Sequence, residues 1–346
     1  MNDFTSQIGS INFDFNAVPD LQPKAVIGIL RKQALPEENV LRDIIPTVPV
    51  ADKLFQSIID DRIDLNLTPE VDMNADDPLV GDNFRFKTDQ VHEYRQAAKI
   101  NIELGQQLMN PEGTPSRYAG QSTLQRLMRN IRIAIDNRRE FNRADAILHA
   151  FEYDPSRKAD LLINNAVTVV DAAAKWDNYT RDSFGNYVCN PFVQISNYKN
   201  RLQFLSTKIP NALIITPDVA AALEGFDNFA NERQPARIAG ARYRIRELDV
   251  FVSQARKNVG TDDKPVLRPM FENMAIITTV NDDEVISERQ YDIDRVDQFV
   301  TADRLFYYVR MWHKSRVTVG RPTQFMFIKD VLQNPYEFSN VSSLFE

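Results

Sequence analysis

Cysteine is almost absent from this chain of 346 residues, in which Cys189 is the only one. A single cysteine excludes an intramolecular disulfide and a zinc site built from cysteines, and we expect it to be a small apolar residue inside the fold. No run approaches the roughly 20 apolar residues that cross a bilayer, so we predict no membrane segment. The residues from Met1 to Phe15 lack the basic and apolar regions of a signal peptide, so we expect synthesis in the cytoplasm.

An excess of positive charge is also missing. The chain has 41 Lys and Arg against 48 Asp and Glu, which gives a net charge of -7. A protein that coats phosphates needs the opposite balance, because most non-specific affinity for nucleic acid comes from counterion release. The densest basic segment carries five arginines between Arg233 and Arg246, but Glu232 and Glu247 flank it and Tyr243 is its only aromatic residue. This composition disfavours a nucleic-acid site.

Motifs of catalysis and cofactor binding are lacking. The sequence has no G-x-G-x-x-G, no Walker loop and no G-x-S-x-G. Its three histidines, His92, His149 and His313, are far apart in the sequence and lie in three different elements, so we expect no metal role for them. We therefore predict no catalytic, cofactor-binding or metal-binding residues, and a protein that is not an enzyme.

Two short patterns resemble functional motifs without meeting their requirements. Asp72-x-Asn74-x-Asp76 is similar to the start of a calcium loop, but Asp77 stands where glycine is needed and Asn83 where glutamate is needed. Asn178-Tyr179-Thr180 has the form of a glycosylation sequon, but nothing in the sequence indicates secretion. We assign no function to either pattern.

The first 45 residues combine scattered apolar residues with Pro19, Pro23 and Pro36. This segment is not expected to form a packed domain, yet it is too apolar for a free linker. We interpret it as an arm that lies on another surface, and we expect deletion of residues 1–30 to leave a folded subunit that fails to form closed shells.

Residues 46 to about 102 are expected to be extended. The runs 63–67 and 84–87 alternate apolar with polar residues, which is typical of strands. Between them, Pro69 to Asp82 is an acidic stretch rich in turn residues. Two alternating runs around a polar tip predict a long hairpin, and its length indicates that it projects from the domain.

A long helix is predicted from Pro115 to Phe151, with two apolar stripes rotated by about a third of a turn from each other. The first stripe comprises Leu124, Leu127, Met128, Ile131, Ala134 and Ile135, and the second comprises Phe141, Ala144, Ile147, Leu148 and Phe151. We expect the two halves of the helix to be buried against different partners. The face away from the first stripe carries Arg129, Arg132, Arg139 and Arg143. These arginines form either a solvated face paired with Asp136 and Glu140 or a contact with a neighbouring subunit.

The remainder alternates strands and helices. Strands are predicted at 166–170, 212–215, 248–252 and 275–280, and helices at 191–205 and from Pro217 to Gly225. Thr216-Pro217-Asp218 is a helix start, with proline at the first helical position. From Leu305, alternating Phe306, Tyr308, Arg310 and Trp312, followed by apolar residues to Ile328, predict adjoining strands of one sheet. Extended segments, a long helix and a mixed region together indicate the α+β class.

One stretch resembles a known family. Lys175-Trp176-Asp177, the helix start at Asn190-Pro191 and the run from Ile209-Pro210-Asn211 to Val219, with Leu223 beyond, are similar to the middle of the major capsid proteins of tailed bacteriophages (Caudovirales). Encapsulins and the floor of herpesvirus capsids share this fold. The motif covers residues 175–223, and the order of elements agrees over nearly the whole chain.

The resemblance implies a division of the chain. Residues 1–45 would be the N-terminal arm, 46–105 the entry strands and the extended loop over a neighbouring subunit, 106–160 the peripheral domain with its spine helix, 161–285 the axial domain, and 286–346 the return strands of the peripheral domain and the tail. It also implies self-assembly as hexamers and pentamers into an icosahedral head in the virion. That head would face packaged double-stranded DNA without binding it specifically.

The implied partners are other copies of the chain and a portal, with a decoration protein as a further candidate. A short arm leaves no room for a cleavable scaffolding segment, so we expect a separate scaffolding protein. Some members of the family cross-link subunits through a Lys and an Asn, but neither partner can be aligned here, so we assign no such chemistry to this chain. Two alternatives remain open: an encapsulin-like nanocompartment shell, disfavoured by the long arm and large hairpin, and a cytoplasmic α/β ligand-binding enzyme, disfavoured by the missing phosphate loop.

Overall fold

The computed structural model describes residues 13–59, 85–149, 168–206, 208–258, 267–291, 295–301 and 306–335. The chain divides into two compact units. Unit 1 comprises Met1–Pro36, Glu93–Asp136 and Asp292–Lys314, and unit 2 comprises Glu37–His92, Asn137–Tyr291 and Ser315–Glu346. Each unit therefore draws on segments that are far apart in the sequence. Within the described ranges, no helix combines the length and hydrophobicity needed to cross a bilayer.

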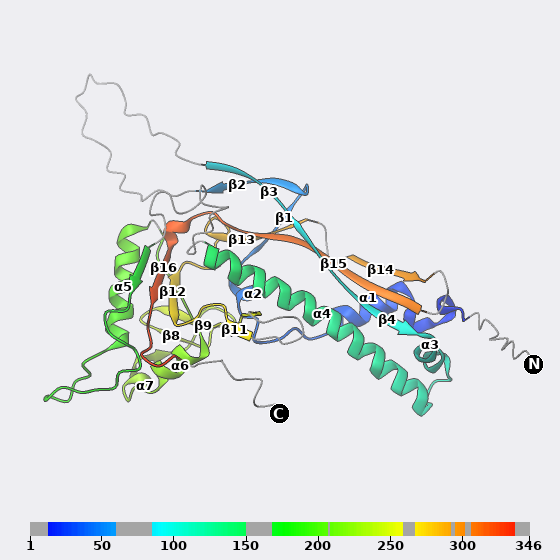
Figure 1. Cartoon of the computed structure of the whole chain (residues 1–346), viewed down its shortest axis with the longest axis horizontal. Coiled ribbons are helices and arrows are strands. Elements are labelled where there is room, and N and C mark those ends of the chain that lie inside the picture. Colours follow the sequence, from blue (N-terminus) through cyan, green and yellow to red (C-terminus); the bar gives the residue numbers. More distant parts are fainter. Residues whose placement is uncertain are drawn as a thin grey trace, which may run out of the picture. The chain divides into compact units, whose positions relative to one another are not determined.

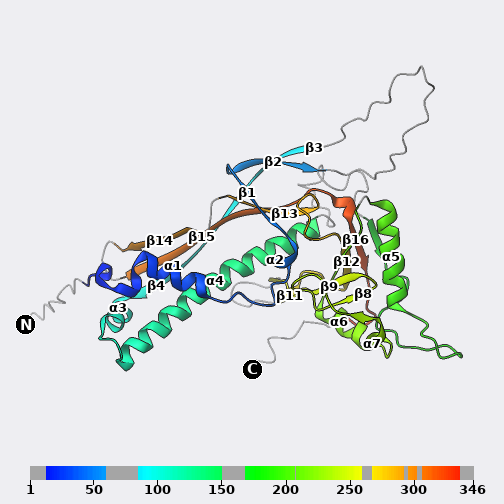
Figure 2. The same ribbon diagram turned by 180° about the vertical axis from the view of Figure 1, so that it is seen from behind.

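Unit 1 is a sheet covered by helices on one face (Figures 1 and 2). Its sheet is made by β14 (Arg295–Val300), the first part of β15 (Phe306–Val319) and β4 (His92–Asn101), both neighbours pairing with β15. β14 runs antiparallel to β15, from Arg295 opposite Trp312 to Val300 opposite Tyr307. The covering elements are η1 (Phe15–Ala17), η2 (Pro19–Leu21), α1 (Pro23–Lys32), α3 (Ile102–Met109) and the first part of α4 (Pro115–His149).

The described part of the N-terminal segment belongs to the core of unit 1. Its buried residues, at most 2% exposed, are Phe15, Val18, Leu21, Val26 and Leu30. The expectation that this segment is not part of a packed domain is therefore wrong for residues 13–32, and the effect of deleting residues 1–30 stays a prediction. Pro23 begins α1 at the first helical position, where the backbone N–H has no partner within the helix, so its absence in proline breaks no hydrogen bond. Gly28 lies inside the helix and has a low helix propensity, which explains why the sequence did not predict α1.

Unit 2 is built on a seven-stranded mixed sheet in the order β5-β16-β12-β6-β9-β8-β7. The bounds are β5 Thr168–Asp171, β16 Phe325–Lys329, β12 Met274–Thr278, β6 Ala212–Ile215, β9 Leu248–Val252, β8 Tyr243–Ile245 and β7 Arg233–Gln234. The helices α5 (Pro191–Leu205), α6 (Pro217–Glu224) and α7 (Phe229–Glu232) complete this region. The helix α5 and the strands β6 and β9 have the bounds that the sequence predicted.

Both faces of this sheet carry buried apolar side chains. Leu213 and Ile215 of β6 enter one core with α5 and α6, while Ala212 and Ile214 enter a second core with the last part of α4 and α2 (Leu41–Ile44). Successive side chains of a strand point to opposite faces, so a fully apolar strand suits a sheet with helices on both sides. Unit 2 is thus a three-layer arrangement.

Smaller strand pairs complete unit 2. β1 (Thr47–Val50) runs parallel to β13 (Ile286–Tyr291), which pairs with the last part of β15. β10 (Arg256–Asn258) pairs with β11 (Leu267–Pro269), and the 3₁₀ helix η3 (Pro322–Gln324) precedes β16. β2 (Leu54–Ile59) pairs antiparallel with β3 (Arg85–Gln90), as two arms of a hairpin should. The tip of the predicted hairpin, between these two strands, lies outside the described residues.

The long helix α4 contributes to both units. Leu124, Met128, Ile131 and Ile135 of the first stripe are buried in the core of unit 1. Ala144, Ile147 and Leu148 of the second stripe are buried in a core of unit 2. The prediction that the two stripes have different partners is confirmed, although Ala134 is exposed.

The closing strands differ from the prediction. β15 is one strand of 14 residues, and β16 lies in the other sheet, between β12 and β5. The prediction of adjoining strands in one sheet is therefore wrong. Alternation identified both strands, but it carries no information about which sheet a strand joins.

The burial of the first stripe gives a direct test. We expect Ile131→Ala, at a side chain that is 2% exposed, to lower the free energy of unfolding by about 2–5 kcal/mol. Arg129→Ala, at an exposed position of the same helix, should change it by less than about 0.5 kcal/mol. Urea unfolding of the unassembled chain, followed by circular dichroism, measures both. Equal effects would contradict the assigned faces of α4.

Candidate functional surfaces

The residues that could have carried metal chemistry do not form a site in the described part of the chain. His92 is exposed on β4, and His313 is 1% exposed on β15. The side chain of His149 and the calcium-like run from Asp72 to Asp76 lie outside the described residues. Among the residues that are described, no group of three or more His, Cys, Asp or Glu is placed to hold a metal ion.

Cys189 is a core residue at the start of α5. Its side chain is 1% exposed, and its Sγ accepts a hydrogen bond of 3.3 Å from Nε2 of Gln194. Burial raises the pKa of the Cys189 thiol, and the hydrogen bond from Gln194 opposes this shift only in part. A protonated, enclosed thiol is a poor nucleophile, so Cys189 has a packing role.

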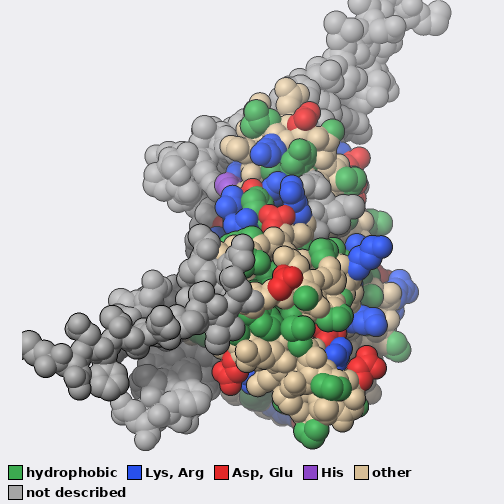
Figure 3. All heavy atoms as spheres, turned by 90° about the vertical axis from the view of Figure 1, so that its right-hand side faces the viewer, with side chains coloured by type: hydrophobic (Ala, Val, Ile, Leu, Met, Phe, Trp, Pro, Cys, Tyr) green, Lys and Arg blue, Asp and Glu red, His purple; other side chains and the backbone are tan. Residues whose placement is uncertain are grey.

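Three of the five arginines between 233 and 246 are paired with polar side chains. Arg246 lies 2.6 Å from Glu232, and Arg242 lies 3.1 Å from Glu224. Arg244 donates to Oε1 of Gln234, which is neutral. Carboxylates therefore offset two of the five positive charges of the segment. On the face that Figure 3 shows, which is the right-hand side of Figure 1, several basic side chains lie close together with acidic ones among them, and hydrophobic side chains are scattered over the rest.

The Lys175-Trp176-Asp177 motif holds the chain after β16. The Trp176 side chain is fully buried in the core beneath α5 and donates from Nε1 to Gln194 Oε1 over 3.2 Å. The Asp177 carboxylate accepts hydrogen bonds of 2.8 and 2.9 Å from the backbone N–H groups of Gln333 and Asn334. The motif therefore ties two distant segments of unit 2 together, which explains why these residue types occur here.

A buried charge network links α4 to β13 in unit 2. The Glu288 carboxylate, 1% exposed, accepts from Nε and Nη2 of Arg139, each over 2.9 Å, and from Nη2 of Arg143 over 2.6 Å. Arg143, 2% exposed, also lies 3.5 Å from Glu140. Glu140 Oε1 accepts a hydrogen bond of 2.9 Å from the backbone N–H of Leu41. The predicted pairing with Glu140 is confirmed for Arg143, but this arginine is buried rather than on a solvated face, and its main partner, like that of Arg139, is the distant Glu288.

A loop of unit 2 presents an apolar tip to solvent. Phe184 is 87% exposed, although the turn around it is well ordered by hydrogen bonds. Asp182 Oδ1 accepts from the backbone N–H groups of Phe184 and Asn186, each over 2.9 Å. At the base, the Tyr187 ring lies 4.8 Å from the Phe226 ring. Figures 1 and 2 show this loop as the green segment that extends beyond α5 and α7.

The sheet of unit 1 has a second face, away from its helices, where aromatic and basic side chains alternate. We call this the aromatic–basic face. It comprises Glu93, Arg95 and Lys99 of β4, Phe306, Tyr308, Arg310, Trp312 and Lys314 of β15, and Arg295, Asp297 and Phe299 of β14. The alternation in the sequence identified Phe306, Tyr308, Arg310 and Trp312. The buried face of the same strand consists instead of Tyr307, Val309 and Met311, which the alternation did not indicate.

Cation–π contacts order this face. The guanidinium carbons of Arg95 and Arg310 lie 4.2 and 4.6 Å from the centre of the Trp312 ring. The Phe299 and Tyr308 rings stack at 5.2 Å across the two strands. Phe299 is nevertheless 42% exposed. Such a face is unusual for a surface that remains in water, because it exposes apolar rings together.

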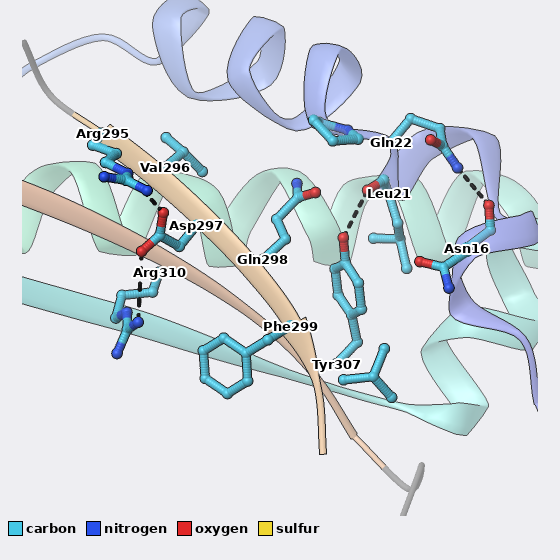
Figure 4. Close-up of a pocket in the computed structure, with 12 residues that line it drawn as sticks. Asn16, Leu21, Gln22, Arg295, Val296, Asp297, Gln298, Phe299, Tyr307 and Arg310 are labelled. Carbon is cyan, nitrogen blue, oxygen red and sulfur yellow. Dashed lines mark hydrogen bonds and ion pairs between the residues drawn. The ribbon is translucent and has the colours of Figure 1, made fainter. Parts of the chain in front are cut away.

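A cavity of about 820 Å³ lies at the free edge of β14 (Figure 4). It is lined by Asn16 and Gln22 on one side and by Gln298 and Tyr307 on the other. The Tyr307 hydroxyl donates to the Leu21 carbonyl over 2.9 Å, and burial raises the pKa of Tyr307 to about 12. Tyr307 is therefore a protonated phenol that joins β15 to η2 through its hydrogen bond.

Comparison with known proteins supports the fold. No family model and no curated protein matches the sequence. A phage-related protein from Bordetella bronchiseptica RB50 superposes with a TM-score of 0.56 and 13% identity, over 89% of this chain and 97% of that one. A virus-like particle protein from Pyrococcus furiosus superposes with a TM-score of 0.50 and 12% identity, over 88% and 97%. The α+β, tailed-phage capsid fold predicted from the sequence is confirmed.

The charge network predicts an asymmetric response to mutation. Glu288→Ala leaves the guanidinium groups of Arg139 and Arg143 without their carboxylate, and Arg143 is 2% exposed. We expect the free energy of unfolding to fall by about 3–5 kcal/mol. Arg295→Ala removes a pair with Asp297 whose arginine is 66% exposed, and should cost less than about 1 kcal/mol. Urea unfolding compares the two variants, and a Glu288→Ala loss as small as the control would disprove the network.

The enclosed thiol gives a second test. Because burial raises the pKa of Cys189, we expect Ellman's reagent to leave the native chain unmodified at pH 8. Addition of urea above the unfolding midpoint should release one reactive thiol per chain, matching the single cysteine. Rapid modification of the native chain would contradict the burial of Cys189.

Proposed function

We propose that this chain is the major capsid protein of a tailed bacteriophage, a shell subunit rather than an enzyme. The observation that carries the proposal is the likeness to a virus-like particle protein over 97% of that protein's length. The other copies of the chain are the principal partner. They would form hexamers and pentamers of an icosahedral head in the virion, with a separate scaffolding protein and a portal as further partners and double-stranded DNA inside.

Surface properties support self-assembly. Phe184, at 87% exposed, and Phe204, at 78%, lie in unit 2, and the aromatic–basic face lies in unit 1. A monomer gains nothing from exposing these rings, whereas a shell buries them between copies.

Two features support DNA that is enclosed but not specifically bound. The net charge is -7, and the densest basic segment is paired with Glu224 and Glu232. An encapsulin-like shell is the alternative, because the same fold is compatible with a shell that encloses DNA and with one that encloses enzymes. A scaffolding protein and a portal encoded beside the chain would favour the phage, and enzymes carrying a shared docking peptide would favour the nanocompartment.

Negative-stain microscopy tests the proposal. The chain, expressed alone and together with its candidate scaffolding partner, should form closed shells, tubes, or rings of five and six subunits. A compact monomer under both conditions would overturn the proposal.

The exposed loop tip predicts a variant that separates folding from assembly. Phe184→Ser should leave the midpoint of thermal unfolding unchanged, since the ring contacts solvent, and should lower the fraction of chain in particles. Ser183→Ala changes the same turn without removing apolar surface and serves as the control. Sedimentation measures the assembled fraction. Normal assembly of Phe184→Ser would show that the loop tip makes no contact needed between copies of the chain.

A further inference from the structure

The helices that cover the sheet of unit 1 carry cations that no acid on the same helix balances. The helix α1 contains Lys24, Arg31 and Lys32, and residues 115–135 of α4 contain four arginines. Neither stretch contains an Asp or a Glu. A solvated helix usually mixes the two signs of charge, because opposite charges three or four residues apart stabilise it. In a chain whose net charge is -7, these two helices are therefore a local reversal of charge.

Five of these cations are exposed and have no partner. We call them the basic helix face, which comprises Lys24, Arg31, Lys32, Arg126 and Arg129. None of their side chains makes an ion pair or a hydrogen bond within the described part of the chain. The arginines of the aromatic–basic face, by contrast, are each paired with Glu93 or Asp297. The unpaired positive charge of unit 1 therefore gathers on its helices.

On α4 the cations lie opposite the core. Met128 and Ile131 are buried in the core of unit 1, whereas Arg126 and Arg129 are exposed. These two arginines are three residues apart, so they are neighbours on the helix surface, about 4.5 Å apart along its axis. They lie far from both ends of a helix of 35 residues, so the helix dipole does not explain them. Two neighbouring like charges without an acid destabilise the helix unless an anion binds there.

Neutral donors, and no exposed apolar side chains, surround these arginines. Ser122, Gln125 and Asn130 are exposed on α4, and each of them can donate a hydrogen bond. Phosphate oxygens accept hydrogen bonds from such side chains as well as from arginine. Between residues 120 and 135, α4 exposes no large apolar side chain of the kind that fills the centre of a protein interface. A phosphate backbone therefore fits this surface better than another protein does.

We propose that the basic helix face binds the phosphate backbone of double-stranded DNA without reading its base sequence. This inference rests on the proposed function, because the head that the chain would form encloses such DNA. Each cation that meets a phosphate releases a counterion, so the affinity rises with the number of contacts and falls with salt. A few local contacts of this kind are compatible with a net charge of -7, which excludes only a chain that coats DNA over its whole surface.

Binding of DNA to the unassembled full-length chain tests the contact. A short DNA duplex labelled with fluorescein is titrated with the chain at several salt concentrations, and its anisotropy is recorded. Arg126→Gln/Arg129→Gln removes two phosphate contacts, so the plot of log affinity against log salt should become less steep by about 2. The affinity at low salt should fall at least about tenfold. Lys24→Gln/Arg31→Gln on α1 should act in the same way, and duplexes of unrelated sequence should bind equally.

The matched control removes the same charge from the opposite face of the sheet. Arg95→Gln/Arg295→Gln replaces arginines that are 53% and 66% exposed and already paired with carboxylates, and it should bind DNA as the natural chain does. No binding of DNA, or equal losses in the control and the helix variants, overturns the inference. Poly-glutamate that binds as tightly as the duplex, and loses as much in Arg126→Gln/Arg129→Gln, also overturns it and assigns the face to acidic proteins.

Assembly separates this inference from the proposed function. Because Arg126 and Arg129 are exposed and unpaired, Arg126→Gln/Arg129→Gln should keep the midpoint of thermal unfolding and form particles as the natural chain does. A folded variant that no longer assembles would assign the face to contacts between copies and overturn the inference. Particles of the natural chain without DNA binding leave the proposed function intact and refute the contact. DNA binding that the variant loses, by a natural chain that forms no particles, supports the contact while the proposed function fails.

Discussion

The Glu288 carboxylate, enclosed by Arg139 and Arg143, is the constraint on which the frame of unit 2 depends. A buried charge is tolerated only when its partners are placed correctly, so the last part of α4 has one permitted position on β13. Glu140 then holds the backbone of Leu41 at the start of α2, and β1 follows to pair with β13. One network therefore fixes a helix, a connecting segment and two strands of unit 2.

Much of the fold could be predicted because its signals are local. Pro217 stands at the first position of α6 and Gly225 directly follows its last residue, as the sequence predicted. The features that the sequence did not reveal depend on distant partners. Arg139 and Arg143 have the polarity of surface residues, and only Glu288, far along the chain, makes them internal.

The candidate surfaces were harder to predict than the elements that carry them. Alternation identified β15, but both of its faces carry bulky residues, so the pattern could not show which face is buried. Tyr307 packs inside with η2, whereas Trp312 lies with arginines on the open side. Phe184 in the sequence is one apolar residue in a polar loop, and its exposure follows from hydrogen bonds that Asp182 makes around it. The proposed assembly of copies into a shell would explain why the Phe184 and Trp312 side chains are both left accessible in the single chain.

The central claim is that surfaces left open in the single chain are closed by other copies of it. Hydroxyl-radical footprinting of the unassembled chain and of purified particles tests this directly, because aromatic side chains report their own exposure. We predict that oxidation of Phe184, Tyr308 and Trp312 falls several-fold in the particles, while exposed Tyr118 serves as an internal reference for dose. Unchanged oxidation of all three residues in assembled particles would contradict the account.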